Sequence, residues 1–174
     1  MAKAEMNNVD PRKLSTEEFV ALLESANGDM DPQVFARLIK HASAEQLSAV
    51  LDEPHRRAVL LDTIFERMAE RFRPENAPKQ DSAIHWRITG GPHGEDVYET
   101  WIIGTQGGAA PQCSTSSEPS HEPRVTLTMA GDQFLALVSG NASPTMMFFT
   151  GKVTLDGDIG FAATLANIFD IPNS

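Results

Sequence analysis

The sequence predicts an α+β fold, in which an all-α N-terminal segment precedes a mixed domain with a largely antiparallel sheet. Up to residue 73, apolar residues recur at helical spacing, whereas beyond residue 81 they alternate in short runs separated by glycine and proline. The polar, proline-punctuated stretch PENAPKQ lies between the two patterns. We therefore expect a flexible N-terminus at 1–14, a helical extension at 15–73, a linker at 74–80 and a folded domain at 81–172.

Four helices account for the N-terminal segment. Ser15 and Glu18 have the spacing of a capping box, and the helix that they begin ends at Asn27-Gly28. Asp31-Pro32 begins a second helix, and Ser43 with Gln46 begins a third. A longer helix starts at Pro54, with an apolar stripe at Leu61, Ile64, Phe65, Met68 and Phe72. The two histidines of this segment, His41 and His55, have no carboxylate or thiol at metal-ligand spacing, so we expect no metal site.

Strands open the second half. The stretch 81–89 alternates, glycines at 90–94 form a hairpin turn, and 97–103 is the returning strand. The polar run 112–119 is an edge strand or a loop. In the alternating pattern of their strands, Trp86 and Trp101 fall on the same side as apolar residues, so both are expected to face the helices.

The stretch from 124 to 169 is unusually rich in large apolar residues. It contains a strand at 125–129, helices at 132–138 and 144–149, a strand at 153–155 and a closing helix at 158–169. Methionine and phenylalanine run consecutively from Met146 to Phe149, and methionine is typical of adaptable binding surfaces. The apolar surface of this stretch exceeds what is needed to cover two short strands, so the surplus apolar surface indicates a cavity.

Charge and cysteine content narrow the classes of partner and compartment. The chain of 174 residues has 24 acids, 14 bases and a net charge of −10, which argues against nucleic acid and anionic lipid as partners. A single cysteine, Cys113, fits a reducing compartment, and neither a signal peptide nor a membrane-spanning run is present. We expect a cytoplasmic protein without stable membrane insertion.

The polar residues of the second half do not form a recognisable active site. No strained nucleophile turn surrounds Ser114, Ser116 or Ser117, and nothing near Cys113 would visibly lower its pKa. Histidines 85, 93 and 121 can in principle pair with Glu99 or with residue 122, but their spacing is not diagnostic. We expect no catalytic residue, metal or cofactor.

Residues from about 83 to 172 resemble the sterol carrier protein 2 family. The resemblance rests on VTLTM at 125–129, GDQFLALVSG at 131–140, the run 144–149, GKVTLDGD at 151–158 and the terminal helix at 161–169. These motifs follow one another in the family's order and spacing, and they cover about half of the chain. The helical extension is similar to that of bacterial members.

The resemblance implies a five-stranded sheet, covered by helices, around an apolar tunnel for a sterol, a fatty acid or an acyl chain. It implies binding and transfer without bond chemistry. The expected ligand-binding residues are those of the matching cavity regions together with Trp101: Phe134, Leu137, Val138, Met146, Met147, Phe148, Phe149, Phe161, Leu165, Ile168 and Phe169.

Two departures and two alternatives accompany this expectation. The chain ends in IPNS rather than a peroxisomal Ser-Lys-Leu signal. Residues 81–174 carry a net charge of −7, which favours delivery of the ligand by proteins over docking on anionic bilayers.

One alternative function is an enzyme or biosynthetic accessory protein acting on an apolar metabolite in the same pocket, with His85, Glu99 or Asp132 as acid–base candidates. The other is a scaffold whose N-terminal helices form a homodimer or recruit a protein partner.

Overall fold

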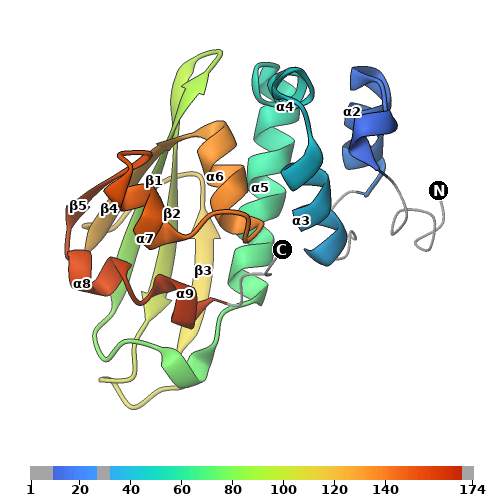
Figure 1. Ribbon diagram of the computed structural model, residues 1–174. Coiled ribbons are helices and arrows are strands. Elements are labelled where there is room, and N and C mark those ends of the chain that lie inside the picture. The colour runs from blue at the N-terminus through green and yellow to red at the C-terminus, as the bar shows by residue number, and fades with distance from the viewer. Residues whose placement is uncertain (1–9, 27–31, 170–174) are drawn as a thin grey trace.

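The computed structural model describes residues 10–26 and 32–169 (Figure 1). All four helices of the N-terminal segment are confirmed, and a short 3₁₀ helix precedes them. Their bounds are η1 Pro11–Lys13, α2 Thr16–Ala26, α3 Pro32–His41, α4 Ala44–Leu51 and α5 Pro54–Glu70.

The two predicted capping boxes form as expected. Glu18 N donates to Ser15 Oγ at 3.1 Å, and Ser15 N donates to the Glu18 carboxylate at 3.2 Å. Ser43 and Gln46 make the same reciprocal pair at 3.0 and 2.9 Å. These bonds satisfy backbone donors that a helix start leaves without partners. The expected signals at Asn27-Gly28 and Asp31 lie outside the described residues.

Part of the stretch expected to be flexible is ordered. In η1, Pro11 is buried, and the buried amide of Gln46 donates to the carbonyls of Pro11 and Leu14 at 2.9 and 3.1 Å. Residues 10–14 are thus attached to α4, whereas 1–9 lie outside the described residues.

A five-stranded mixed sheet forms the centre of the fold (Figure 1). The strand order is β3-β2-β1-β4-β5, with β1 and β4 parallel and the other pairs antiparallel. The sheet is thus largely antiparallel, as expected, but β4 pairs in parallel with β1 rather than antiparallel with β3. The strands are β1 Ser82–Gly91, β2 Gly94–Ile103, β3 Gln112–Ser116, β4 Val125–Ala130 and β5 Val153–Gly157.

Helix α5 and the helices that follow β4 cover one face of this sheet, where the strand side chains are buried, whereas α2–α4 pack mainly against one another (Figure 1). An aromatic cluster lies at the centre: Phe65 of α5 stacks on Tyr98 at 4.3 Å between ring centroids and on Phe134 at 5.1 Å, and Trp86 meets both phenylalanines edge-on at 5.9 Å. Aromatic pairs in such geometries add to the stabilisation from burial itself. Helix α5 therefore belongs to the same core as the sheet, although it precedes the proposed linker at 74–80.

The opposite face of the sheet is polar, and it carries Trp101. The prediction that both tryptophans face the helices is wrong for this residue. Along β2, Glu99 and Trp101 alternate with the core-facing Tyr98, Thr100 and Ile102, and His85 of β1 lies opposite Glu99. Antiparallel sheets commonly expose one face in this way.

The remaining helices follow β4 and close the fold. They are α6 Gly131–Val138, α7 Pro144–Phe149, α8 Ile159–Ala162 and α9 Leu165–Ile168. The single closing helix expected at 158–169 is divided into α8 and α9. Thr164 Oγ1 donates to the Phe161 carbonyl at 2.6 Å, a local bond that competes with regular helix pairing. Phe161, Leu165, Ile168 and Phe169 nevertheless all point into the core.

Candidate functional site

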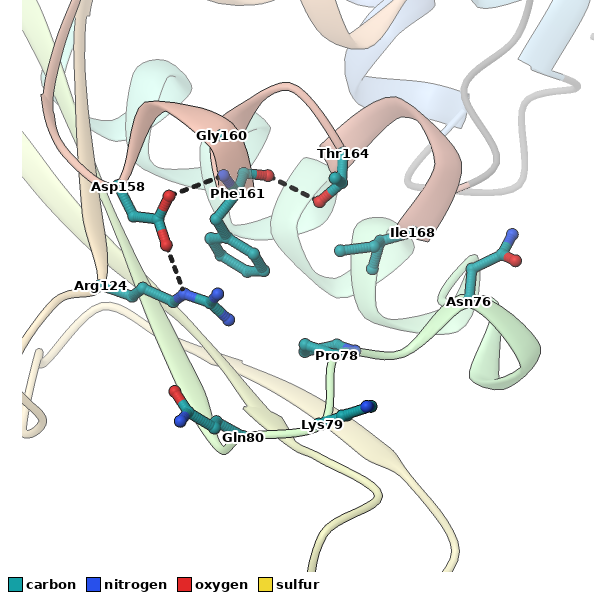
Figure 2. Close-up of a pocket in the computed structure, with 10 residues that line it drawn as sticks. All are labelled: Asn76, Pro78, Lys79, Gln80, Arg124, Asp158, Gly160, Phe161, Thr164 and Ile168. Carbon is teal, nitrogen blue, oxygen red and sulfur yellow. Dashed lines mark hydrogen bonds and ion pairs between the residues drawn. The ribbon is translucent and has the colours of Figure 1, made fainter.

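A pocket of about 540 Å³ opens at the end of the sheet where β4 begins (Figure 2). It lies between the segment that follows α5, the residue before β4, and the last two helices. This volume falls within the range of about 300–1,000 Å³ that is usual for small-molecule sites. Its lining residues are Asn76, Pro78, Lys79, Gln80, Arg124, Asp158, Gly160, Phe161, Thr164 and Ile168.

Arg124 is a cation of the pocket lining, and three partners orient it. Its Nε donates to Asp158 Oδ2 at 3.0 Å and its Nη1 to Ser82 Oγ at 3.0 Å. The guanidinium carbon lies 4.2 Å from the centre of the Phe161 ring, a cation–π geometry. Figure 2 shows the end of the guanidinium directed toward the open side of the pocket. A guanidinium has five N–H donors, so Arg124 retains donors for a bound acceptor.

The sequence around Asp158 explains why the pocket has this shape. Gly157 has φ +107°, and a Cβ there would lie 2.5 Å from the Arg124 carbonyl oxygen, so the turn requires glycine. Asp158 then caps α8 by accepting from Phe161 N at 2.9 Å, while its own N–H donates to the Arg124 carbonyl at 2.9 Å. This cap positions the Phe161 ring against the Arg124 guanidinium (Figure 2).

The stretch expected to be a linker forms one wall of the pocket. On one side, Asn76 Nδ2 donates to the Asn167 carbonyl at 2.7 Å and Arg73 N donates to the Ile168 carbonyl at 2.7 Å. On the other side, the turn after β2 donates to Pro78 and Lys79 carbonyls at 3.1 and 2.8 Å. The segment is thus held between α9 and the β2–β3 turn.

The ionisable residues among the lining are Lys79, Arg124 and Asp158. The Phe161 N–H and then the Arg124 guanidinium donate hydrogen bonds to Asp158, and they lower its pKa below the usual range of an aspartate. Asp158 is therefore a carboxylate at neutral pH and already has partners. With two cations and one anion, the pocket carries a net positive charge in a chain whose total is −10.

The structure separates the sequence-predicted ligand residues into three groups. Phe161 and Ile168 line the pocket. Six lie in the core and do not line the pocket, and they are fully or largely buried: Phe134, Leu137, Val138, Met147, Leu165 and Phe169. Met146, Phe148 and Phe149 are exposed on α7, and Trp101 stands on the polar face of the sheet.

Sequence reasoning missed most of the polar lining, including Arg124, Asp158 and the wall at 76–80. One signal pointed to Arg124, since it is one of only three cations after residue 80 and it stands directly before a buried strand. The wall had no such signal, because its polar residues are typical of any connecting segment.

The polar face brings together a second group of candidate residues around Glu99. This buried carboxylate accepts from His85 Nε2 at 2.9 Å, from His121 Nδ1 at 2.7 Å, and from the backbone of Ser120 and His121 at 3.2 and 2.9 Å. The His121 ring stacks on Trp101 at 3.7 Å. Burial alone would raise the pKa of Glu99, but the hydrogen bonds from His121, His85 and Ser120 outweigh it and lower the pKa to about 2.

This cluster does not have the arrangement of a nucleophilic site. Ser120 Oγ lies 3.3 Å from Nδ1 of His121, the same nitrogen that binds Glu99. A nitrogen that donates to the carboxylate cannot also accept the serine proton, so no relay of serine, histidine and acid is formed. Burial raises the pKa of Cys113 to about 12, which leaves this thiol protonated and unreactive.

The described part of the chain has neither a metal-ligand cluster nor a helix suited to a bilayer. Within residues 10–26 and 32–169, no group of three or more His, Cys, Asp or Glu side chains could hold a metal ion. Over the same ranges, none of the helices has the length and apolarity needed to cross a bilayer.

Comparison with known proteins identifies relatives of this arrangement. A model of the SCP-2 sterol transfer family matches residues 62–170, well over half of the chain. Sterol carrier protein 2 of Bos taurus is 30% identical over 108 residues, and that of Homo sapiens is 27% identical over 108 residues. Each match covers 60% of this chain and 19% of the relative, so the chain spans about a fifth of the length of these curated relatives.

Two solved structures are similar to this chain. Palmitated SCP2L2 from Aedes aegypti is 22% identical with a TM-score of 0.48, over 66% of this chain and 97% of that one. The stereoselective inverting sec-alkylsulfatase Pisa1 from Pseudomonas sp. is 15% identical with a TM-score of 0.52, over 98% of this chain and 29% of that one. The second likeness shows that helical segment and sheet recur together within a longer chain.

Proposed function

The chain belongs to the SCP-2 sterol transfer family, and on this premise we propose that it binds and transfers a lipid or another apolar small molecule without bond chemistry. The observation that carries the proposal is the pocket beside Arg124. Phe161 and Ile168 give it an apolar floor, and the guanidinium gives it a single well-oriented donor group. A pocket that combines an apolar surface with convergent polar groups is typical of small-molecule binding.

The ligand class follows from this combination of groups. The apolar floor favours a hydrocarbon body, such as a sterol, a fatty acid or an acyl chain. The remaining N–H donors of Arg124, together with Lys79 at the rim, favour a head group with acceptor oxygens. The curated relatives are named sterol carriers, which agrees with an apolar ligand of this kind.

The same geometry favours carriage over catalysis. An acid–base enzyme needs a titratable group that faces the ligand, and Asp158 is already bonded to Arg124 and to the α8 backbone. The acid–base candidates named from the sequence lie elsewhere. His85 and Glu99 are on the polar face of the sheet, and Asp132 is exposed in the first turn of α6.

That the buried core residues beyond Phe161 and Ile168 contact the ligand stays a prediction. Met147, Leu165 and Phe169 belong to the core that continues from Ile168, so a long ligand that extends past the pocket would displace them first. A cytoplasmic location, and a homodimer or protein partner held through α2–α4, likewise stay predictions.

Displacement of a fluorescent fatty acid, with a sterol as a second competitor, tests the proposal. We expect the wild-type chain to take up the probe, and Arg124→Met to weaken binding of the carboxylate about tenfold or more through loss of a charge-assisted hydrogen bond. Arg87→Met is the matched control, because Arg87 is exposed on the polar face and pairs with Glu95.

A second variant blocks the pocket without removing a polar group. Gly160 lines the pocket, and a Cβ there meets only Asp158 Oδ1, at 3.4 Å. We expect Gly160→Leu to reduce uptake of every probe while the protein still melts cooperatively. A folded wild-type protein that takes up neither fatty acid nor sterol contradicts the proposed function, and undiminished uptake by folded Gly160→Leu contradicts the placement of the site.

A further inference from the structure

Helix α7 presents an unusual apolar surface to solvent. Met146 is 59% exposed, Phe148 39% and Phe149 76%, and the two phenylalanine rings pack edge-on at 5.8 Å. Met147, which lies between Met146 and Phe148 in the sequence, is buried in the core and attaches the helix to the sheet. We refer to Met146, Phe148 and Phe149 as the α7 apolar face. Isolated exposed apolar residues are ordinary, but a contiguous group of large ones marks an interaction site.

The charge around this face differs from that of the whole chain. The net charge is −10, yet no acid occurs between Asp132 and Asp156, and Lys152 is the single charged residue of residues 133–155. Lys152 is exposed at the turn between α7 and β5. The α7 apolar face is thus set in the least acidic stretch of the chain, with a cation close in sequence.

These features fit a lipid surface better than a protein groove. A helix that binds in the groove of a partner protein contacts it through side chains spaced over at least two helical turns. Helix α7 has only six residues, and its exposed large side chains are within four positions of one another. Aromatic and methionine side chains beside a lysine suit the bilayer interface, where the rings enter the acyl boundary and the ammonium reaches lipid phosphates.

We propose that the α7 apolar face docks peripherally on the interface of a zwitterionic lipid bilayer, with Lys152 placed at the phosphate level. The overall negative charge disfavours anionic membranes at long range, so the docking depends on apolar insertion rather than on surface potential. It would bring a lipid carrier to a membrane without stable insertion. The inference concerns a partner surface, and it does not require the pocket to be occupied.

Co-sedimentation with phosphatidylcholine vesicles tests the proposal on the full chain. We expect the wild type to bind, and Phe149→Asp and Met146→Asp each to reduce vesicle partitioning about tenfold or more, since each removes one inserted side chain and adds a charge. Val59→Asp is the matched control: Val59 is 40% exposed on α5, so the same change there should leave vesicle binding unaltered. Equal losses in all three variants would overturn the assignment to α7.

Vesicle composition and salt separate insertion from charge attraction. With phosphatidylglycerol added to the vesicles, we expect weaker binding at low salt that recovers as salt screens the repulsion, and with phosphatidylcholine alone little change. Tighter binding to the anionic vesicles at low salt, or no binding to phosphatidylcholine, would overturn the proposal.

Two controls keep this result apart from folding and from the proposed function. The mutated α7 side chains are exposed, so thermal melting should stay cooperative, and a variant that has unfolded is replaced by Met146→Ser. Arg124→Met is expected to lose affinity for the fatty-acid probe and to keep vesicle binding. A wild-type chain that takes up the fatty-acid probe but does not bind the vesicles would therefore reject the docking surface alone. A wild-type chain that binds the vesicles but takes up no probe would reject the carrier function alone.

Discussion

Arg57 of α5 and Asp96 of β2 meet at 2.6 Å between Nε and Oδ2, which attaches the helical segment to the first hairpin of the sheet. The guanidinium is buried, and its Nη2 donates to the carbonyls of Ile88 and Thr89 at 3.0 and 3.2 Å. A Cβ on Gly91 would lie 2.8 Å from Arg57 Nε, so the chain makes room for this group. One side chain thus joins a helix to both strands of a hairpin.

Removal of Arg57 should destabilise the protein far more than removal of its acidic partner. Arg57→Met leaves buried carbonyls without donors and should cost about 3 kcal/mol, whereas Asp96→Asn affects a half-exposed carboxylate and should cost less than about 1 kcal/mol. Urea unfolding at neutral pH measures both. Similar losses for the two variants would show that the ion pair, rather than the carbonyl contacts, makes the main contribution.

Gly157 should tolerate no side chain. Gly157→Ala places a Cβ 2.5 Å from the Arg124 carbonyl oxygen at φ +107°, so we expect a loss of about 2 kcal/mol or more in the free energy of unfolding, together with weaker uptake of the fatty-acid probe. Gly107→Ala is the control, since a Cβ there meets no atom within 4 Å. If the two variants are equally stable, the turn before α8 is not constrained as described.

Glu99 should make stability depend on pH in the acid range. Its pKa is lowered to about 2 in the folded protein from about 4.5, so its contribution is complete above the unfolded value and is lost as pH falls through the folded value. Between pH 5 and pH 2 we expect a loss of roughly 2 kcal/mol from this group. Urea midpoints across this range measure it, and Glu99→Gln should have a flatter profile. Parallel profiles would assign the pH dependence to other carboxylates.

A fragment that begins at residue 81 should not fold on its own. Phe65 is buried against Tyr98 and Phe134, so deletion of α5 exposes the aromatic centre of the core. A fragment from residue 53 onward keeps α5 with its N-cap at Glu53, and we expect it to melt cooperatively. Thermal melts followed by circular dichroism compare the two, and a cooperative melt of 81–174 would restore the proposed boundary at 74–80.

Local signals predicted most elements because the physics that determines them is local. Capping pairs at Ser15 and Ser43 marked helix starts, and alternation marked the strands. The prediction of which face of β2 is buried was wrong because both faces of the strand carry aromatic residues, Trp101 on one and Tyr98 on the other. Side-chain hydrogen bonds identify the buried face: Tyr98 donates to Asp62 on α5 at 2.6 Å, and Trp86 Nε1 donates to Thr100 at 3.0 Å.

The pocket was harder to predict than the fold, because its residues are distant in sequence and mostly polar. The apolar surplus after residue 124 included Phe161 and Ile168, which line the pocket. It also indicated Met146 and Phe149, whose exposure no helical periodicity reveals in an element as short as α7. The Glu99 cluster depends on the 117–123 loop, which is held over the sheet by hydrogen bonds to Glu99 and by the stacking of His121 on Trp101.

The position of β4 has a consequence for how the molecule assembles. Strands β1 and β2 form a hairpin of adjacent segments, but β4 pairs with β1 across about forty intervening positions, with Ile84 opposite Val125. Closing so long a loop is slower than closing a hairpin. Arg124 reaches Ser82 only when this parallel pairing forms. We therefore expect the pocket to be completed late in folding, so that a probe bound in it would report whether the non-local half of the sheet has formed.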